Sequence, residues 1–433
     1  MNVYEAAQHR LKFIFDEFEN VLVALSGGKD SGVCINLCYD YAKKNNMLHK
    51  LAVYHEDYEA GYPQTFEYIE RVFDSMPEIK RYWLCLPIKA ACSVSMHQTH
   101  WIPWDEKQKH LWVRDMPNKE YVFTEKDVFF SFKKGTSGFD LRIQFAKEFA
   151  KRYGTTAVIV GLRMDESLSR RAIITSQRRV NTYKNKSYST IVSPETVNFY
   201  PICDWRTQDI WIANYKFNWD YNRLYDLYYQ AGLNISDMRT ASPFHASGQH
   251  HLKLYKVICP NMWGKMVSRV NGVNFTGIYG GTTAMGWMNI KKPNHFTWKE
   301  YAEFLINTLP ESLQKKVRYH LARLTQSWTE EGYGRNPRVI KAIEDAGVKI
   351  ENTHKISKLC TKPDVYEIIK IKGDWPDEID IEGATPFRHC PNWKAVCVTL
   401  MKNDFTLQYM GLGRTKEQNQ RRKNIMEKYK SLL

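Results

Sequence analysis

The chain has 433 residues, 43% of them hydrophobic and 14% aromatic, and its 62 lysines and arginines exceed its 47 acidic residues to give a formal net charge of +15. This length predicts two domains, and the absence of any run near the ~18 apolar residues of a membrane span, with no apolar signal region at the N-terminus, predicts a cytoplasmic protein. The charge favours a polyanionic partner, with a merely basic surface as the alternative, and nine cysteines in such a chain do not indicate a disulfide framework.

The first half of the chain alternates short apolar runs with helical patterns. The predicted strands are Val21–Leu25, Leu51–Tyr54, Arg81–Leu86, Ala157–Gly161 and Val197–Ile202. The predicted helices are Gly32–Lys44, Pro63–Met76, Phe139–Tyr153 and Thr207–Asn214. Continuous apolar strands separated by helices predict an α/β fold with a doubly wound, mostly parallel sheet.

A polar and aromatic stretch at about residues 93–138 is too long for a plain connection, so it predicts an insertion that acts as a lid or binding loop. Beyond about residue 241 the alternation fades. Thr297 and Glu300 have capping-box spacing, and helical periodicity continues past a break at Pro310. We therefore expect a nucleotide-binding domain at residues 1–245 and a mainly helical C-terminal domain at residues 246–433, ending in a basic helical tail.

The segment Ser26–Ser31, Ser-Gly-Gly-Lys-Asp-Ser, follows a predicted buried strand and opens a helix. Gly27 and Gly28 allow a sharp turn and close approach to a ligand. The N–H groups of the helix start point outward at the positive end of the helix dipole, beside two hydroxyl groups. The junction therefore predicts a phosphate site, although it lacks the spacing of a Walker loop. A plain strand-to-helix turn is the alternative.

This segment resembles the PP-loop of the N-type ATP pyrophosphatase (adenine nucleotide alpha-hydrolase-like) superfamily, which grips nucleotide phosphates. The resemblance implies that Ser26, Gly27, Gly28, Lys29, Asp30 and Ser31 bind the nucleotide. The stretch from His55 to Thr65 resembles a motif of 3′-phosphoadenosine-5′-phosphosulfate (PAPS) reductases, and it adds Asp57 to the expected binding residues. The segments Tyr200–Trp211 and Tyr221–Asp226 resemble later motifs of the same family, in the same order.

The stretch Gly161–Arg170 is similar to a further motif of the PAPS reductases and to one of the ATP sulfurylase small subunit. The resemblance adds Gly161 and Arg163 to the nucleotide site. Arg163 also follows the carboxyl end of a predicted strand, where α/β sheets bind ligands, and a guanidinium there suits phosphate or sulfate. Arg163 and Arg170 are the expected catalytic arginines, together with Asp30. Asp165 and Glu166 could be a pair of carboxylates that face a metal ion, or equally two acidic residues that stabilise the start of a helix.

The chain departs from the reductases because it lacks their C-terminal catalytic cysteine motif, and Cys360, Cys390 and Cys397 have no comparable context. It is therefore not expected to be a thioredoxin-linked PAPS reductase. Motifs after residue 235, including Gly373–Pro376 and Pro391–Cys397, resemble IbrA-type proteins, which carry a C-terminal domain of unknown function and often occur beside a ParB-like partner. That resemblance implies a possible ParB-like protein partner.

Two functions remain open. The first is an enzyme that binds ATP or PAPS, with Mg²⁺ as a possible companion of the phosphates, and carries out ATP-dependent adenylation with pyrophosphate release, or sulfurtransferase chemistry. Asp30 would support either the loop geometry or the Mg²⁺. The second is a nucleotide-sensing regulator that binds DNA or RNA and turns over little. Trp101, Trp104 and Trp112, interleaved with lysines, suit base stacking or equally a small hydrophobic subcore. The Cys and His residues of the chain show no recurring metal-ligand spacing, so no protein metal site is predicted.

Overall fold

A computed structural model describes residues 2–95, 98–175, 181–235, 237–245, 248–279, 290–345, 347–356, 366–379, 390–407 and 410. The chain divides into two compact units, which are taken separately below. The first consists of Met1–Cys92 with His100–Asn271, and the second of Ser93–Thr99 with Gly272–Leu433. The units therefore change over at residues 271–272, whereas the sequence predicted a boundary near 245. Among the described residues, no helix is both long and apolar enough to cross a membrane.

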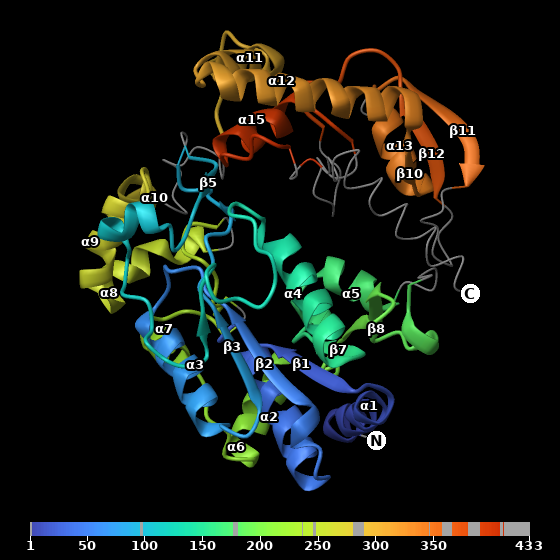
Figure 1. Cartoon of the computed structure of the whole chain (residues 1–433). Helices are drawn as coiled ribbons and strands as arrows, with labels where there is room; N and C mark the ends of the chain where they lie inside the picture. Colours follow the sequence, from blue (N-terminus) through green and yellow to red (C-terminus); the bar gives the residue numbers. More distant parts are fainter. Residues whose placement is uncertain are drawn as a thin grey trace. The chain divides into compact units, whose positions relative to one another are not determined.

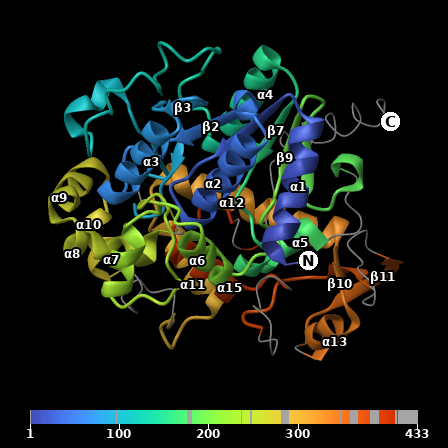
Figure 2. The ribbon, with the colours of Figure 1, turned by 90° about the horizontal axis from the view of Figure 1, so that it is seen from below.

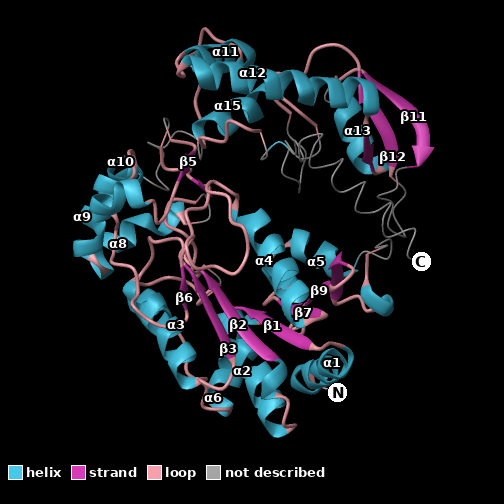
Figure 3. Ribbon diagram, viewed as in Figure 1, coloured by secondary structure: helices cyan, strands magenta, loops and turns pink. Residues whose placement is uncertain are grey.

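The first unit is built on a seven-stranded sheet with the strand order β6-β3-β2-β1-β7-β9-β8 (Figure 3). Every neighbouring pair is parallel except β8 with β9. In chain order the strands are β1 (Asn20–Ala24), β2 (Leu51–Glu56), β3 (Lys80–Leu84), β6 (Val122–Phe123), β7 (Thr156–Ile159), β8 (Ser189–Ser193) and β9 (Thr196–Phe199). A two-stranded ribbon, β4 (Ala90–Ala91) with β5 (His100–Trp101), lies outside this sheet.

Helices cover both faces of the sheet, as can be followed in Figures 1 and 2. The helices of this unit are α1 (Val3–Glu17), α2 (Lys29–Lys44), α3 (Pro63–Ser75), α4 (Gly138–Tyr153), α5 (Leu168–Thr175), α6 (Thr207–Lys216), α7 (Leu224–Gln230), α8 (Tyr255–Ile258) and α9 (Pro260–Arg269). Val21 and Val23 of β1 pack into one core with α1, α2 and α3, whereas Leu22 packs into a second core with α4. Both faces of β1 are buried, which explains why its sequence is a continuous apolar run.

The second unit contains helices and a small antiparallel sheet. Its described helices are α10 (Val273–Tyr279), α11 (Trp298–Asn307), α12 (Glu311–Gln326), α13 (Pro337–Asp345) and α15 (Trp393–Met401). The sheet has the order β10-β12-β11, with β10 (Tyr333–Arg335), β11 (Ile350–Ile356) and β12 (Glu367–Ile371). One core of apolar side chains joins α11, α12, α13 and α15 to this sheet.

The fold class predicted from the sequence is confirmed. Each of the five predicted strands and four predicted helices exists within a few residues of its expected bounds. The capping box is formed, because the Thr297 hydroxyl accepts the Glu300 N–H at 3.1 Å and the Glu300 carboxylate accepts the Thr297 N–H at 2.7 Å. The three-stranded sheet of the second unit was not predicted. The basic tail from residue 414 lies outside the described residues.

Candidate functional site

The segment Ser26–Ser31 joins the end of β1 to the first turn of α2. Gly27 has a φ of 76°, a left-handed conformation that favours glycine. The Ser31 hydroxyl donates to the Gly28 carbonyl at 3.0 Å, accepts the Ser26 N–H at 3.1 Å and lies 3.0 Å from the Ser26 hydroxyl. These bonds fold the loop back over the start of α2, which is the sharp turn that Gly27 and Gly28 predicted.

The glycines of the site are required by the protein's own packing. A Cβ on Gly27 would lie 2.6 Å from Thr65 Cγ2, and one on Gly28 would lie 2.7 Å from Thr240 Oγ1. A Cβ on Gly161 would lie 2.9 Å from the backbone nitrogen of Ser31. In these positions the missing side chains allow three other segments of the chain to close around the loop.

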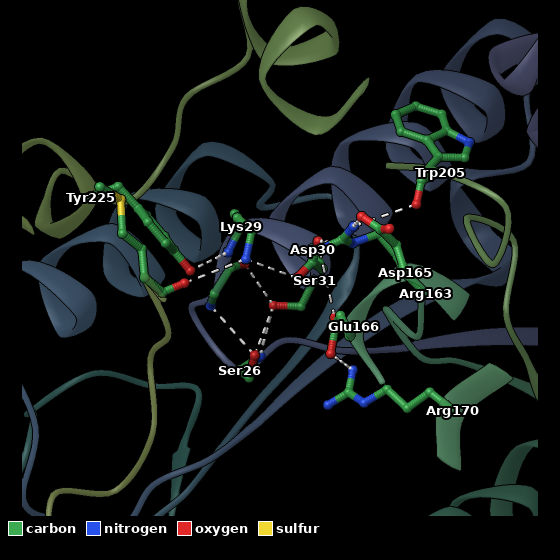
Figure 4. A network of polar contacts seen from close by, with 12 residues as sticks. Ser26, Lys29, Asp30, Ser31, Arg163, Asp165, Glu166, Arg170, Trp205 and Tyr225 are labelled. Atoms are coloured by element: carbon green, nitrogen blue, oxygen red, sulfur yellow. Dashed lines mark hydrogen bonds and ion pairs between the residues drawn. The ribbon is translucent and has the colours of Figure 1, made fainter. Parts of the chain in front are cut away.

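The loops after β1 and β7 meet at the point where the strand order reverses direction, which is where open α/β sheets bind ligands. Arg163, four residues beyond β7, donates from Nε to Asp30 Oδ1 at 2.6 Å and from a terminal nitrogen to the Trp205 carbonyl at 3.4 Å (Figure 4). Only 2% of the Arg163 side chain is exposed. Arg163 therefore ties the two loops together from inside the protein, so its role in this structure is to position Asp30.

Arg170 lies at the outer end of the same network. Its guanidinium pairs with the Glu166 carboxylate, and 42% of its side chain is exposed. Arg163 lies 3.9 Å from the other oxygen of Glu166. Burial and the nearby charge of Asp30 raise the pKa of Glu166, and the two arginines oppose that rise. Arg170 is thus the arginine with most freedom to reach a bound ligand.

Lys29 is largely buried at the start of α2. Its Nζ lies 3.4 Å from Asp30 Oδ2, 3.5 Å from the Met238 carbonyl and 5.6 Å from the centre of the Tyr225 ring. The charged side chains in Figure 4 are equal in number. The cations are Lys29, Arg163 and Arg170, and the carboxylates are Asp30, Asp165 and Glu166.

Asp57, expected at the nucleotide site, is held by neighbours of its own. Its carboxylate pairs with Arg114, accepts the Trp83 indole N–H at 2.6 Å and accepts the Glu59 N–H at 2.8 Å. Burial opposes its ionisation, but the nearby Arg114 and His55, together with the hydrogen bonds from Trp83 and Arg114, lower the pKa of Asp57. With Asp57 only 1% exposed, these contacts give it the role of a buried anchor for the insertion.

The insertion is fixed to the body of the first unit by a second buried acid. Glu59 is fully buried and forms two bonds with Arg269, at 2.8 and 2.9 Å. It also accepts the backbone N–H groups of Trp104 and Val113 at 2.9 and 3.0 Å. Trp101, like Trp104 and Trp112, is no more than 9% exposed. Trp104 and Trp112 pack edge-on against each other in the main core of the unit, and Trp101 packs against Phe244, so the base-stacking interpretation is not supported.

Metal ligands and reactive thiols do not gather in the described part of the chain. No three Cys, His, Asp or Glu residues within it are placed to hold a metal ion. Burial raises the pKa of the Cys390 and Cys397 thiols to about 12 each, so both stay protonated at neutral pH. Cys360 lies outside the described residues.

Sequence reasoning missed three residues that close the loop from the far side of the chain. Asn222 donates to the Gly27 carbonyl at 2.8 Å and to the Thr65 hydroxyl at 2.9 Å. The Tyr225 hydroxyl accepts the Lys29 N–H at 2.9 Å, and Thr240 lies over Gly28. The motif Tyr221–Asp226 pointed to this segment, but nothing in its residues indicated that it contacts a loop almost 200 positions earlier.

Comparison with protein families covers most of the chain. Residues 20–232 match the phosphoadenosine phosphosulfate reductase domain, and residues 232–421 match a domain of unknown function, DUF3440. The uncharacterized protein YbdN of Escherichia coli (strain K12) is 29% identical over 432 residues, covering 98% of this chain and 94% of YbdN.

Solved structures show weaker similarity. A phosphate complex of PAPS reductase from Candida auris is 16% identical, with a TM-score of 0.29, over 51% of this chain and 84% of that one. The NH₃-dependent NAD synthetase from Campylobacter jejuni, in complex with nitrate, is 13% identical, with a TM-score of 0.28, over 68% of this chain and 99% of that one. Scores at this level support no argument about function.

Proposed function

We propose that this chain, whose residues 20–232 match the phosphoadenosine phosphosulfate reductase domain and whose residues 232–421 match DUF3440, binds the phosphates of an adenine nucleotide at Ser26–Ser31. The observation that carries the proposal is the position of this loop. It lies at the amino end of a sixteen-residue helix and at the reversal point of the sheet, with the Arg163 loop beside it. A helix N-terminus favours an anion through its N–H groups and its dipole.

The reaction that this site suits best is adenylation of an acceptor. An acceptor oxygen would attack the α-phosphorus of ATP and form a new P–O bond, while the bond between the α- and β-phosphates breaks and pyrophosphate leaves. Arg170 would stabilise the charge that develops on the phosphates. Arg163 would hold Asp30 and the loop in place. Handling of a sulfonucleotide such as PAPS, with sulfur transfer, uses the same anion site and is the second form of this proposal.

Mg²⁺ fits the residues of the site poorly. Both carboxylate oxygens of Asp30 face cations, Oδ1 toward Arg163 and Oδ2 toward Lys29. A hard cation needs several free oxygen ligands. Asp30 therefore serves loop geometry in this proposal, and no step is assigned to a protein-bound metal.

A nucleic-acid or ParB-like partner, and a role as a nucleotide-sensing regulator, rest on the net charge of +15 and on motif resemblance. A mobility-shift titration of duplex and single-stranded oligonucleotides at two salt concentrations, with and without ATP, tests this alternative. Genuine polyanion binding weakens steeply as salt rises. Binding that is absent even at low salt would leave the charge as a basic surface.

Nucleotide binding and pyrophosphate release test the main proposal. Calorimetric titration with ATP and with PAPS, in parallel with a pyrophosphate-release assay, is carried out on the full chain and on two variants. Ser31→Ala removes the hydroxyl that organises the loop, and we expect it to weaken binding about tenfold or more. Ser75→Ala, which removes a hydroxyl that donates to the Val72 carbonyl at the end of α3, is the matched control. Equal nucleotide affinity in the wild type and in Ser31→Ala would contradict the proposal.

A further inference from the structure

The first N–H group of α2 is not open to a ligand. Helix α2 begins after Gly28, which has no side chain to cap it. The N–H of Lys29, the first residue of the helix, donates instead to the Tyr225 hydroxyl at 2.9 Å. An N–H group that already has an acceptor in line cannot serve a phosphate oxygen equally well. A phosphate bound at this loop would therefore contact the Tyr225 hydroxyl at the place where the free Lys29 N–H would otherwise point.

The Tyr225 hydroxyl is held in place by its ring. The ring packs edge-on against Trp211, with centroids 5.2 Å apart, and against Tyr228 at 6.3 Å, while Lys29 Nζ lies 5.6 Å from its centre. Only 3% of Tyr225 is exposed. A ring packed on several sides does not swing away readily. The Tyr225 hydroxyl is thus a fixed part of the loop's surroundings. A side chain that had to move aside when a ligand binds would need more conformational freedom than this ring has.

The Tyr225 hydroxyl can also donate a hydrogen bond. Since the hydroxyl oxygen accepts from Lys29, its own O–H is left to donate. Burial raises the pKa of Tyr225, which keeps that proton on the oxygen. The neighbouring side chain is Thr240, whose hydroxyl, like that of Tyr225, lies close to the place that a Cβ on Gly28 would take, 2.7 Å and 3.5 Å away respectively, on a half-buried loop. The Thr240 side chain, which lies on a loop, can change its position more readily than the packed ring of Tyr225.

We propose that Tyr225 is a phosphate-binding residue of this site: its hydroxyl takes the first N–H of α2 and donates its own proton to a phosphate oxygen of the bound nucleotide. The proposal rests on the proposed function. It places the contact on the phosphates and not on the base or the ribose. It also explains why a residue almost 200 positions after the loop lies against it.

The test measures affinity for three probes in the full-length protein: ATP, inorganic pyrophosphate and adenosine. Tyr225→Phe keeps the ring and removes only the oxygen. A hydrogen bond to a charged group implies that ATP and pyrophosphate bind about 10- to 100-fold more weakly to this variant, while adenosine affinity changes less than about twofold. Tyr228→Phe is the matched control, because its hydroxyl bonds the Arg239 carbonyl and not the loop. It should leave all three affinities unchanged.

ATP and pyrophosphate affinities in Tyr225→Phe that equal or exceed those of the wild type would overturn the proposal, and so would an equal loss for adenosine, which indicates a structural role. If Tyr225→Phe does not fold, Thr240→Val decides: we expect unchanged or tighter pyrophosphate binding, and a loss of more than about threefold refutes the proposal. A wild type that binds neither ATP, PAPS nor pyrophosphate contradicts the proposed function itself, and with it the role of Tyr225.

Discussion

Replacing Arg163 with alanine tests whether this arginine holds the site together. The guanidinium is 2% exposed and bonds Asp30 at 2.6 Å and the Trp205 carbonyl at 3.4 Å. Its removal leaves Asp30 Oδ1 without its buried cation, while Lys29 still faces Oδ2 and Arg170 still pairs with Glu166. Breaking a buried pair in this way costs about 3–5 kcal/mol. Because 16% of the Asp30 side chain reaches solvent, we expect a value near the lower end, about 3 kcal/mol.

This loss is a large part of the roughly 5–15 kcal/mol that stabilises an ordinary domain. Hydrogen exchange, measured in the full chain across a series of urea concentrations, gives the opening free energy of peptides from β1 and β7. The same change in an Asp30→Ala background should cost about 1–3 kcal/mol less, because the pair is already broken. Lys12→Ala, which removes an exposed partner of Asp16, is the control and should leave these peptides unchanged.

A loss below about 1 kcal/mol in Arg163→Ala, or equal losses in the two backgrounds, would refute the assignment of Arg163 as an internal tie. The arginine would then have to be regarded as a free ligand-binding group, as its place after a predicted strand first suggested.

Three further variants probe other parts of the site and the sheet. Gly161→Ala places a Cβ 2.9 Å from the Ser31 nitrogen, so nucleotide affinity should fall about tenfold. Gly264→Ala, where no atom lies within 4 Å of the new Cβ, is the control and should bind as the wild type does. Equal affinities in the two variants would show that the two loops do not need this contact. Arg170→Ala should lower turnover more than stability, since 42% of its side chain is exposed; unchanged pyrophosphate release would remove Arg170 from the reaction. Burial raises the pKa of Glu56 to about 7 from 4.5, so the stability that its protonated form contributes is complete below pH 4.5 and is lost as the pH rises through 7, a change of at most about 3 kcal/mol. Glu56→Gln should make the unfolding free energy less dependent on pH over this range. An unaltered pH profile in this variant would contradict the role of Glu56.

The sequence predicted the sheet where burial leaves a simple pattern. Central strands such as β1 are apolar on both faces, so the chain shows them as unbroken runs. Strand β8 is an antiparallel edge strand of mixed sequence, Ser189–Ser193, and β11 exposes most of its side chains, so neither differs clearly from a loop. Their pairing depends on partners distant in the chain, which local periodicity does not report.

The candidate site also contains residues whose positions the sequence could predict and residues whose positions it could not. Ser26–Ser31 and Arg163 lie in the loops after β1 and β7, and because parallel strands end at one edge of the sheet, their proximity follows from their positions. Tyr225 and Thr240 reach the loop through tertiary packing alone. Asp57 matches a motif of the family, but its burial against Arg114 depends on where the insertion folds. Residue type and order predicted where the loop lies, and packing determined which neighbours are free to contact a ligand.

The measurement that tests the central claim most directly is hydrogen exchange of the loop amides as the nucleotide binds. Exchange of peptides spanning residues 25–32 is followed in the full chain with saturating ATP and, separately, with PAPS. If phosphate is held at the start of α2, exchange there should slow, with a matching effect in the peptide that carries Arg163 and none in peptides from α9. Nucleotide binding that leaves exchange at residues 25–32 unchanged would contradict the account, because the phosphates would then lie elsewhere.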